Sequence, residues 1–429
     1  MINKRKFQDN ILKMVKRETV PAIGCTEPVA VAYASAVAKK YLDGEINKIV
    51  VNVSLNIFKN GKFVKIPKTE ESGLELAAAL GAICGEVDEG LCVLKNVNSD
   101  YINLAKDMIK DGKIILSKED NTPYVYVKVY MESEDNNVEV ILKDSHDHIE
   151  KIIVNKELVY QDLLNGEENS PDFLKQFTLK EFREVCENVD IERLDFIEDG
   201  IKMNVNAAER GIENGKGLGL GFGLSRLQKN GKVGDNPFMK ARIMTAAGAD
   251  FRMGGGDCPI MTSGGSGNQG LGVILPIVAV YEYEESNISR ERLLRGIFYG
   301  HIINKFVKAY VGKLSAFCGC AISAGVGASA AITWMLGGND KQISGSVQNM
   351  LANLTGMICD GAKETCALKL STSVGEAILS SYLALDNIMT KPNNGILGNT
   401  AEETIKNLGI LSRDGMLNTD KVIVDIMNS

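Results

Sequence analysis

The sequence predicts an α+β protein in which a smaller lobe with antiparallel strands is joined to a larger, mostly α-helical domain. Two patterns support this fold class. Between residues 45 and 160, short runs of alternating apolar and polar residues are separated by polar turns, which is typical of strands. From residue 173 to 429, apolar residues recur at helical spacing in one segment after another. A polar stretch between them, QDLLNGEENSPD at 161–172, has the composition of a linker.

The overall composition excludes several classes of protein. The 429 residues are 45% hydrophobic and 24% charged, which is enough for a large core divided among two or three domains. A net charge of −7 argues against nucleic acid or an anionic membrane as a partner. The basic N-terminus lacks the apolar run of a signal peptide, and the longest apolar run, 271–281, is far short of the roughly 20 residues of a membrane span. We therefore expect a cytoplasmic protein whose nine cysteines are reduced and available for metal binding or catalysis.

Residues 1–44 are expected to form two helices that pack on the helical domain. The first, an amphipathic helix over 6–19, ends before Pro21. The second begins with Thr26 as the N-cap and Glu27 in the first turn. Cys25 then lies just before a helix N-terminus, whose partial positive charge lowers the pKa of a thiol, so that Cys25 is a candidate general base. A buried structural cysteine is the alternative. Glu27 is either a helix cap, which we favour, or a ligand for an amine.

Residues 45–160 are predicted to form the α+β lobe. A strand over 49–55, a hairpin turn at Asn60-Gly61 and a second strand over 62–66 come first. Helices at 71–84 and 98–111 follow, and then strands at 124–131, 138–143 and 148–154. His146 and His148 lie in a polar stretch between two of these strands, which favours a solvated turn over a metal site.

Eight helices are predicted beyond the linker, at 179–188, 191–211, 234–248, 290–311, 321–336, 343–358, 362–382 and 401–408. The glycine-rich segment 215–225 is interpreted as a loop or lid. His301 is expected to be a buried core histidine. Lys313, on the segment leading into Cys318, is a candidate for binding a carboxylate, with a solvated side chain as the alternative.

A second glycine-rich segment, MGGGDCPIMTSGGSGNQG at 253–270, has more definite chemistry. Glycines interleaved with Ser and Thr allow backbone N–H groups to converge on an anion, and a small carboxylate is the anion we expect. A nucleotide-binding loop is the rival, but no Gly-Lys-Ser/Thr sequence closes the segment. Cys258 within it is interpreted as a buried structural residue.

Four of the nine cysteines, Cys318, Cys320, Cys359 and Cys366, are found between residues 314 and 376. Thiolates are the ligands that iron–sulfur clusters and zinc select. The single residue between Cys318 and Cys320 does not match the spacers of two to four residues in structural zinc sites. On an unbroken helix Cys359 and Cys366 would lie about 10 Å apart on one face, whereas a break at Gly361 would bring them closer. Core packing is the alternative for any one of them.

Together, these segments resemble the L-cysteine desulfidase family and, more distantly, the iron–sulfur L-serine dehydratases. The similarity runs through PAIGCTEPVAVAYA at 21–34, GGGDCPIMTSGGSGNQG at 254–270 and GKLSAFCGC at 312–320, and so covers nearly the full chain. The resemblance implies that residues 173–429 form an all-α catalytic domain that binds a 4Fe-4S cluster through Cys318, Cys359 and Cys366, with one iron left open. The dehydratase motif aligns equally well with Cys320 in place of Cys318.

The resemblance also implies a reaction, the non-redox β-elimination of L-cysteine to pyruvate, ammonia and sulfide. Cys25 would remove the α-proton, and the substrate's carboxylate and amine would be held by a polar set, Ser263, Ser266, Asn268 and Gln269. Three alternatives stay open: an L-serine dehydratase, a non-catalytic protein with a closed four-thiolate cluster or metal site, and a pyridoxal-phosphate lyase, for which we find no convincing phosphate cup. A homodimer is compatible with the sequence.

Overall fold

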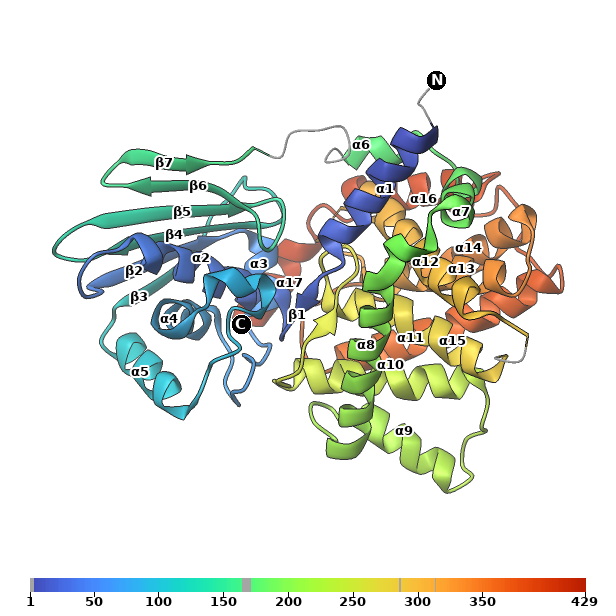
Figure 1. Cartoon of the computed structure of the whole chain (residues 1–429), viewed down its shortest axis with the longest axis horizontal. Helices are drawn as coiled ribbons and strands as arrows, with labels where there is room; N and C mark the ends of the chain where they lie inside the picture. Colours follow the sequence, from blue (N-terminus) through green and yellow to red (C-terminus); the bar gives the residue numbers. More distant parts are fainter. Residues whose placement is uncertain (1–3, 164–170, 285–286, 313) are drawn as a thin grey trace.

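Two hydrophobic cores divide the chain into a sheet domain and a helical domain, which lie side by side in Figure 1. The computed structural model describes residues 4–163, 171–284, 287–312 and 314–429. The predicted α+β class, with a smaller stranded lobe and a larger helical domain, is confirmed. No helix among these residues is both long and apolar enough to cross a membrane.

The sheet domain is built on six strands in the order β3-β2-β4-β5-β6-β7. Only the β2–β3 pair is parallel. Every second residue of the central strands is apolar and faces the core, as in the fully buried cross-strand row of Val51, Val129 and Val140. Their bounds are β2 Lys48–Val53, β3 Ile114–Lys118, β4 Tyr126–Glu132, β5 Asn137–Lys143, β6 Ile149–Val154 and β7 Glu157–Gln161. The sequence did not predict β3 and β7, which form the two edges.

Helices α2 (Thr26–Tyr41), α4 (Leu74–Cys84) and α5 (Ser99–Lys110) belong to the sheet domain, and α2 packs on β4, β5 and α4. A Cβ on Gly81 of α4 would lie 2.1 Å from the Ala32 carbonyl oxygen, so the two helix backbones touch. This placement corrects the expectation that both N-terminal helices pack on the helical domain. Helix α1 (Lys4–Glu18) does contribute Ile11 and Leu12 to the helical core. Helix α2 is buried along most of its length and carries many small residues, and its apolar side chains belong to the core of the sheet domain.

The predicted hairpin at Asn60-Gly61 is wrong, because residues Leu55–Gly61 form a short helix, α3. Ser54 starts it by accepting a hydrogen bond from the backbone N–H of Ile57 at 3.2 Å. A Cβ on Gly61 would lie 2.2 Å from the Leu74 side chain, which shows how closely the end of α3 approaches α4. As a result, Lys59 Nζ donates to the Cys359 carbonyl of the helical domain at 3.0 Å, and Asn60 lies between the domains, with Nδ2 3.0 Å from Glu27 Oε1 and Oδ1 3.9 Å from Cys359 Sγ.

The helical domain surrounds the nearly fully buried α11 and α13, and every residue of α13 is buried. Its helices are α6 Pro171–Leu174, α7 Leu179–Asn188, α8 Asp195–Asn214, α9 Leu220–Lys229, α10 Pro237–Met253, α11 Gly267–Tyr283, α12 Arg290–Val311, α13 Ile322–Met335, α14 Asp340–Leu354, α15 Cys366–Leu385 and α16 Ala401–Ile410. Two 3-10 segments, η1 (Val87–Cys92) in the sheet domain and η3 (Ile191–Leu194), and one π-helical turn, η4 (Leu411–Gly415), lie between the longer elements. The structure differs from the sequence prediction at two helices: α11 was not expected, and α9 begins inside the predicted 215–225 loop.

Two connections join the domains. Strand β1 (Pro21–Ala22) pairs with β8 (Ile260–Met261), so the segment leading to Cys25 is tied to the glycine-rich segment of the helical domain. The last helix, α17 (Thr419–Asn428), leaves the helical domain and packs on α3, where Figure 1 shows it in red beside the blue elements of the sheet domain. The surfaces between the domains are therefore fixed from both ends of the chain.

Candidate active site between the two domains

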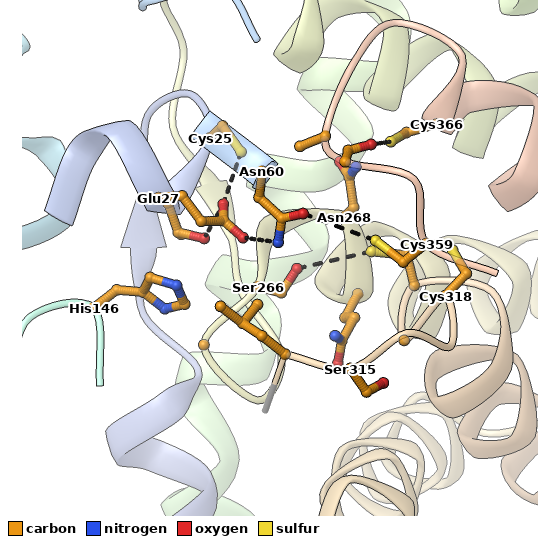
Figure 2. Close-up of a pocket in the computed structure, with 18 of the residues that line it drawn as sticks. Cys25, Glu27, Asn60, His146, Ser266, Asn268, Ser315, Cys318, Cys359 and Cys366 are labelled. Carbon is orange, nitrogen blue, oxygen red and sulfur yellow. Dashed lines mark hydrogen bonds between the residues drawn. The ribbon is translucent and has the colours of Figure 1, made fainter. Parts of the chain in front are cut away.

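A cavity of about 70 Å³ lies where the two domains meet. The sheet domain lines it with Cys25, Glu27, Asn60 and His146, and the helical domain with Arg252, Ser266, Asn268, Gln269, Cys318, Cys320, Cys359 and Cys366. In Figure 2, Glu27 and His146 lie on the side opposite Cys318 and Cys359. The site thus needs both domains, and it brings together most of the residues that the sequence singled out.

Two loops of the helical domain place Cys318 and Cys359 next to each other. The backbone N–H of Cys318 donates to the Met357 carbonyl at 2.9 Å, and that of Cys359 to the Ala316 carbonyl at 2.7 Å, so the loops pair like short antiparallel strands. Cys366 follows at the first turn of α15. Gly361, with φ +95°, breaks the chain between them, and a Cβ there would lie 2.7 Å from the Lys59 carbonyl oxygen. The break at Gly361 is confirmed, and the unbroken helix is wrong.

Four thiols line this cavity, those of Cys318, Cys320, Cys359 and Cys366. Thiolates are ligands both of zinc and of iron–sulfur clusters, so the chemistry of this donor set fits either group. Among the described residues, no group of three or more His, Cys, Asp or Glu side chains is arranged to hold one ion.

Burial and nearby charges act in opposite directions on these thiols: the pKa is raised for Cys320, Cys359 and Cys366 and lowered for Cys318. The buried ammonium of Lys59 donates to the Cys359 carbonyl at 3.0 Å, and Lys369 donates to the Ile358 carbonyl at 2.9 Å. Burial raises the pKa of Cys359, and the two lysines oppose that rise. A hydrogen bond from Cys320 lowers the pKa of Cys318. The sequence missed both lysines; only Lys369, one turn after Cys366, had a position that could have drawn attention to it.

Cys25 itself is the N-cap of α2, one residue before the predicted Thr26, and its side chain is 2% exposed. Its Sγ donates a hydrogen bond to Glu27 Oε2 at 2.9 Å. Burial, followed by the negative charge of Glu27, raises the pKa of the Cys25 thiol well above its ordinary value. The expectation that the helix N-terminus lowers this pKa is therefore wrong, because desolvation and the neighbouring carboxylate outweigh the helix dipole.

Glu27 turns its carboxylate toward the cavity (Figure 2). Its Oε1 accepts a hydrogen bond from Asn60 Nδ2 at 3.0 Å, and its Oε2 accepts those from Cys25 and Thr26. Although burial alone would raise it, the charge of His146 and the hydrogen bond from Cys25 lower the pKa of Glu27. The carboxylate is thus ionised. It lies in the first turn of α2, as the capping role requires, and it also lines the cavity, as the amine-ligand role requires.

His146 is the site residue that the sequence interpretation placed wrongly. It lies between β5 and β6 and was expected in a solvated turn. In the structure it is 7% exposed and lines the cavity. Its Nδ1 is 3.8 Å from the position of a Cβ on Gly265 in the other domain. Its neighbour His148 is structural, since Nδ1 lies 2.9 Å from the Lys143 carbonyl oxygen. No local pattern distinguishes the two histidines, because only domain packing covers His146.

Of the four polar residues of the glycine-rich segment that were predicted to hold the substrate, three face the cavity and one does not. Ser266 is the N-cap of α11, and Asn268 and Gln269 lie in its first turn; all three line the cavity. Ser263, predicted to touch substrate, is fully buried, and its Oγ lies 2.7 Å from His301 Nδ1 and accepts from Asn304 at 2.8 Å. Ser263 therefore positions the segment. The prediction for Lys313 falls outside the described residues.

His301 is a core histidine, as expected, and burial lowers its pKa to about 3. Arg252, the next to last residue of α10, was missed. Its guanidinium is 4% exposed, lines the cavity and donates to Asn268 Oδ1 at 2.9 Å. Its place directly before the Met-Gly-Gly-Gly run is the one sequence signal that could have revealed it.

Comparison with known proteins agrees with this site. Residues 88–425 match the family described as the serine dehydratase alpha chain. A UPF0597 protein of Clostridium botulinum strain Okra / Type B1 is 54% identical over 427 residues, covering 99% of this chain and 98% of the relative. UPF0597 proteins of Caldanaerobacter subterraneus subsp. tengcongensis and Clostridioides difficile strain 630 are 43% and 38% identical, covering 96% and 97% of this chain and 97% and 99% of their own.

Proposed function

The chain belongs to the serine dehydratase alpha chain family, and on this premise we propose that it is an iron–sulfur lyase that removes the β-substituent of a small α-amino acid to give pyruvate and ammonia. L-cysteine, which releases sulfide, is the substrate we propose, and L-serine is the second candidate because the family is named for a serine dehydratase. The observation that carries the proposal is the cavity itself, where four thiols, an ionised carboxylate and the first turn of α11 face one small volume.

Cys318, Cys359 and Cys366 are the residues that would hold a 4Fe-4S cluster. The loops of Cys318 and Cys359 pair through backbone hydrogen bonds, and Lys59 donates a hydrogen bond to the Cys359 carbonyl. Such a cluster supplies a Lewis-acidic iron that stabilises the departing sulfide or hydroxide without a change of oxidation state. Cys320 is not needed as a ligand in this proposal and lies beside Ser266, whose Oγ is 4.0 Å from its Sγ.

We assign removal of the α-proton to Cys25 and Glu27 acting together. The thiol is protonated at neutral pH, because its pKa is raised. As the Cys25 sulfur takes the α-proton, its own proton passes along the 2.9 Å hydrogen bond to Glu27 Oε2. The pair thus moves one proton from carbon to carboxylate. Asn60 keeps the Glu27 carboxylate oriented toward the thiol through its bond to Oε1.

Gln269 is the residue that we propose for the substrate's ammonium group. Its side chain is 4% exposed, and its Oε1 has no hydrogen-bond partner among the described residues. A buried acceptor without a donor costs free energy, and an ammonium group would supply the donor. Glu27 supplies the negative charge on the other side of the cavity.

The test is pyruvate release by protein purified anaerobically and reconstituted with iron and sulfide. L-cysteine and L-serine are assayed separately, and air-exposed protein is the control. We expect pyruvate from L-cysteine matched by an equal amount of sulfide, and loss of both after exposure to air. Protein with a full complement of iron that releases no pyruvate from either amino acid would refute the lyase and support a closed, non-catalytic cluster protein.

A further inference from the structure

The guanidinium of Arg252 is a buried positive charge with an unused hydrogen-bonding edge. Its Nη1 donates to Asn268 Oδ1 at 2.9 Å and to the Met253 sulfur at 3.4 Å. Its Nε and Nη2 are buried and have no partner among the residues that the structure describes. None of these residues forms a salt bridge with it, although its charge contributes to lowering the pKa of Glu27.

The free edge lies over the N-terminus of α11. A Cβ on Gly267, the first residue of α11, would lie 2.4 Å from Arg252 Nε, so only glycine admits the guanidinium here. The Ser266 side chain does not cap the helix. The first N–H groups of any helix lack intrahelical partners and carry partial positive charge. The charge of the Arg252 guanidinium and the partial positive charge of the α11 N-terminus therefore lie on the same side of the cavity.

This arrangement is costly unless an anion completes it. A buried charge without a counter-ion is strongly destabilising, and each unpaired buried donor adds to that cost. Nε and Nη2 form one edge of the planar guanidinium, and this edge matches the two oxygens of a carboxylate.

We infer that the Nε and Nη2 edge of Arg252, together with the N-terminus of α11, binds the α-carboxylate of the substrate. The identity of the substrate rests on the proposed function, whereas the carboxylate subsite rests on Arg252 itself. The subsite restricts binding to amino acids with a free α-carboxylate and rejects amides and simple amines. Asn268 is a positioning residue, because its Oδ1 fixes Nη1 and so orients the opposite edge.

The inference is tested with L-alanine, which has no leaving group, and L-alaninamide, which lacks the carboxylate. Binding to the reconstituted protein is measured by saturation-transfer NMR for the wild type, Arg252→Gln and Arg252→Lys. The matched control is Arg242→Gln, on the same helix but bonded to Ser371 away from the cavity. For L-alanine we expect the Kd to rise about 100-fold in Arg252→Gln and about tenfold in Arg252→Lys, since a bidentate charged contact is lost or weakened. Arg242→Gln should not change it.

Comparison of the two ligands on the wild type needs no variant, so the test survives a folding defect. We expect L-alaninamide to bind at least about tenfold more weakly than L-alanine. Equal binding of the two ligands, no binding of L-alanine, or a folded Arg252→Gln protein with unchanged Kd would overturn the inference. Arg252-dependent binding without pyruvate release would refute the proposed function alone. Pyruvate release with an unchanged KM in Arg252→Gln would refute the subsite alone.

Discussion

Replacing Asp420 with Asn tests whether the C-terminal helix supports the cysteine site. Asp420 Oδ1 accepts a hydrogen bond from Lys59 Nζ at 2.5 Å, and Oδ2 accepts one from Asn56 at 2.7 Å. The Lys59 side chain is 1% exposed and that of Asp420 is 16% exposed. The same ammonium holds the Cys359 carbonyl. Removing the carboxylate charge leaves Lys59 buried with only neutral acceptors.

The expected loss of stability follows from that burial. Removing one partner of a buried ion pair costs about 3–5 kcal/mol, because the remaining charge is not solvated. Asparagine still offers an amide oxygen, so we expect a value near the lower end, about 3 kcal/mol. In a Lys59→Met/Asp420→Leu double variant the charges disappear together, so folding should be restored, but the Cys359 carbonyl loses its donor. The double variant should therefore fold and still retain less iron than the wild type.

The assay is equilibrium urea unfolding, followed by circular dichroism and by the fluorescence of Trp334, the one tryptophan in the sequence. The matched control is Asp414→Asn, in the same C-terminal segment but with its carboxylate on the surface beside Arg413. The control curve should overlay that of the wild type. A loss below about 0.5 kcal/mol for Asp420→Asn, the range of a surface pair, would show that this contact does not anchor the site.

Three further outcomes follow from the site. Cys320→Ser should keep the iron content and the pyruvate release of the wild type, whereas Cys359→Ser should lose both; loss of iron in Cys320→Ser would indicate four ligands. Glu27→Gln should lower kcat about 100-fold or more with unchanged iron content, and an unaltered kcat would remove Glu27 from the proton transfer. The pKa of His301 is depressed to about 3, so its contribution to stability is present above its ordinary value of 6.5 and is lost as the pH falls. Below pH 6.5, the free energy of unfolding measured with urea should therefore fall by up to about 1.4 kcal/mol per pH unit because of His301. His301→Asn should remove this contribution, and the same pH dependence in the wild type and the variant would contradict the account.

Features that depend on neighbouring residues in the chain could be predicted from the sequence. Helices Leu179–Asn188 and Arg290–Val311 begin and end where predicted. Their starts are set by local caps, a capping box at Thr178 and the Ser289 hydroxyl. The clustering of cysteines between 314 and 376 likewise indicated one thiol site before the fold was known.

Features that depend on packing between domains could not be predicted. Arg252 and His146 enter the cavity from different domains, and only the packing of the two domains brings both side chains to it. Lys59 was not identified because the alternating pattern around it predicted a hairpin, whereas Ser54 starts a helix there. For Cys25 the helix N-terminus was visible in the sequence, but the depth of burial and the direction of the Glu27 carboxylate, which reverse the pKa shift, were not.

The most direct test of the central claim, that thiols in this cavity hold a cluster with an iron open to substrate, is a Mössbauer measurement. Protein carrying Glu27→Gln, whose turnover should be at least about 100-fold slower than that of the wild type, is reconstituted with ⁵⁷Fe and sulfide and is measured before L-cysteine is added and after rapid freezing with it. We predict a 4Fe-4S spectrum in which one iron changes its parameters when the amino acid binds. A spectrum without a 4Fe-4S cluster, or a cluster spectrum unchanged at saturating L-cysteine and L-serine, would contradict the account.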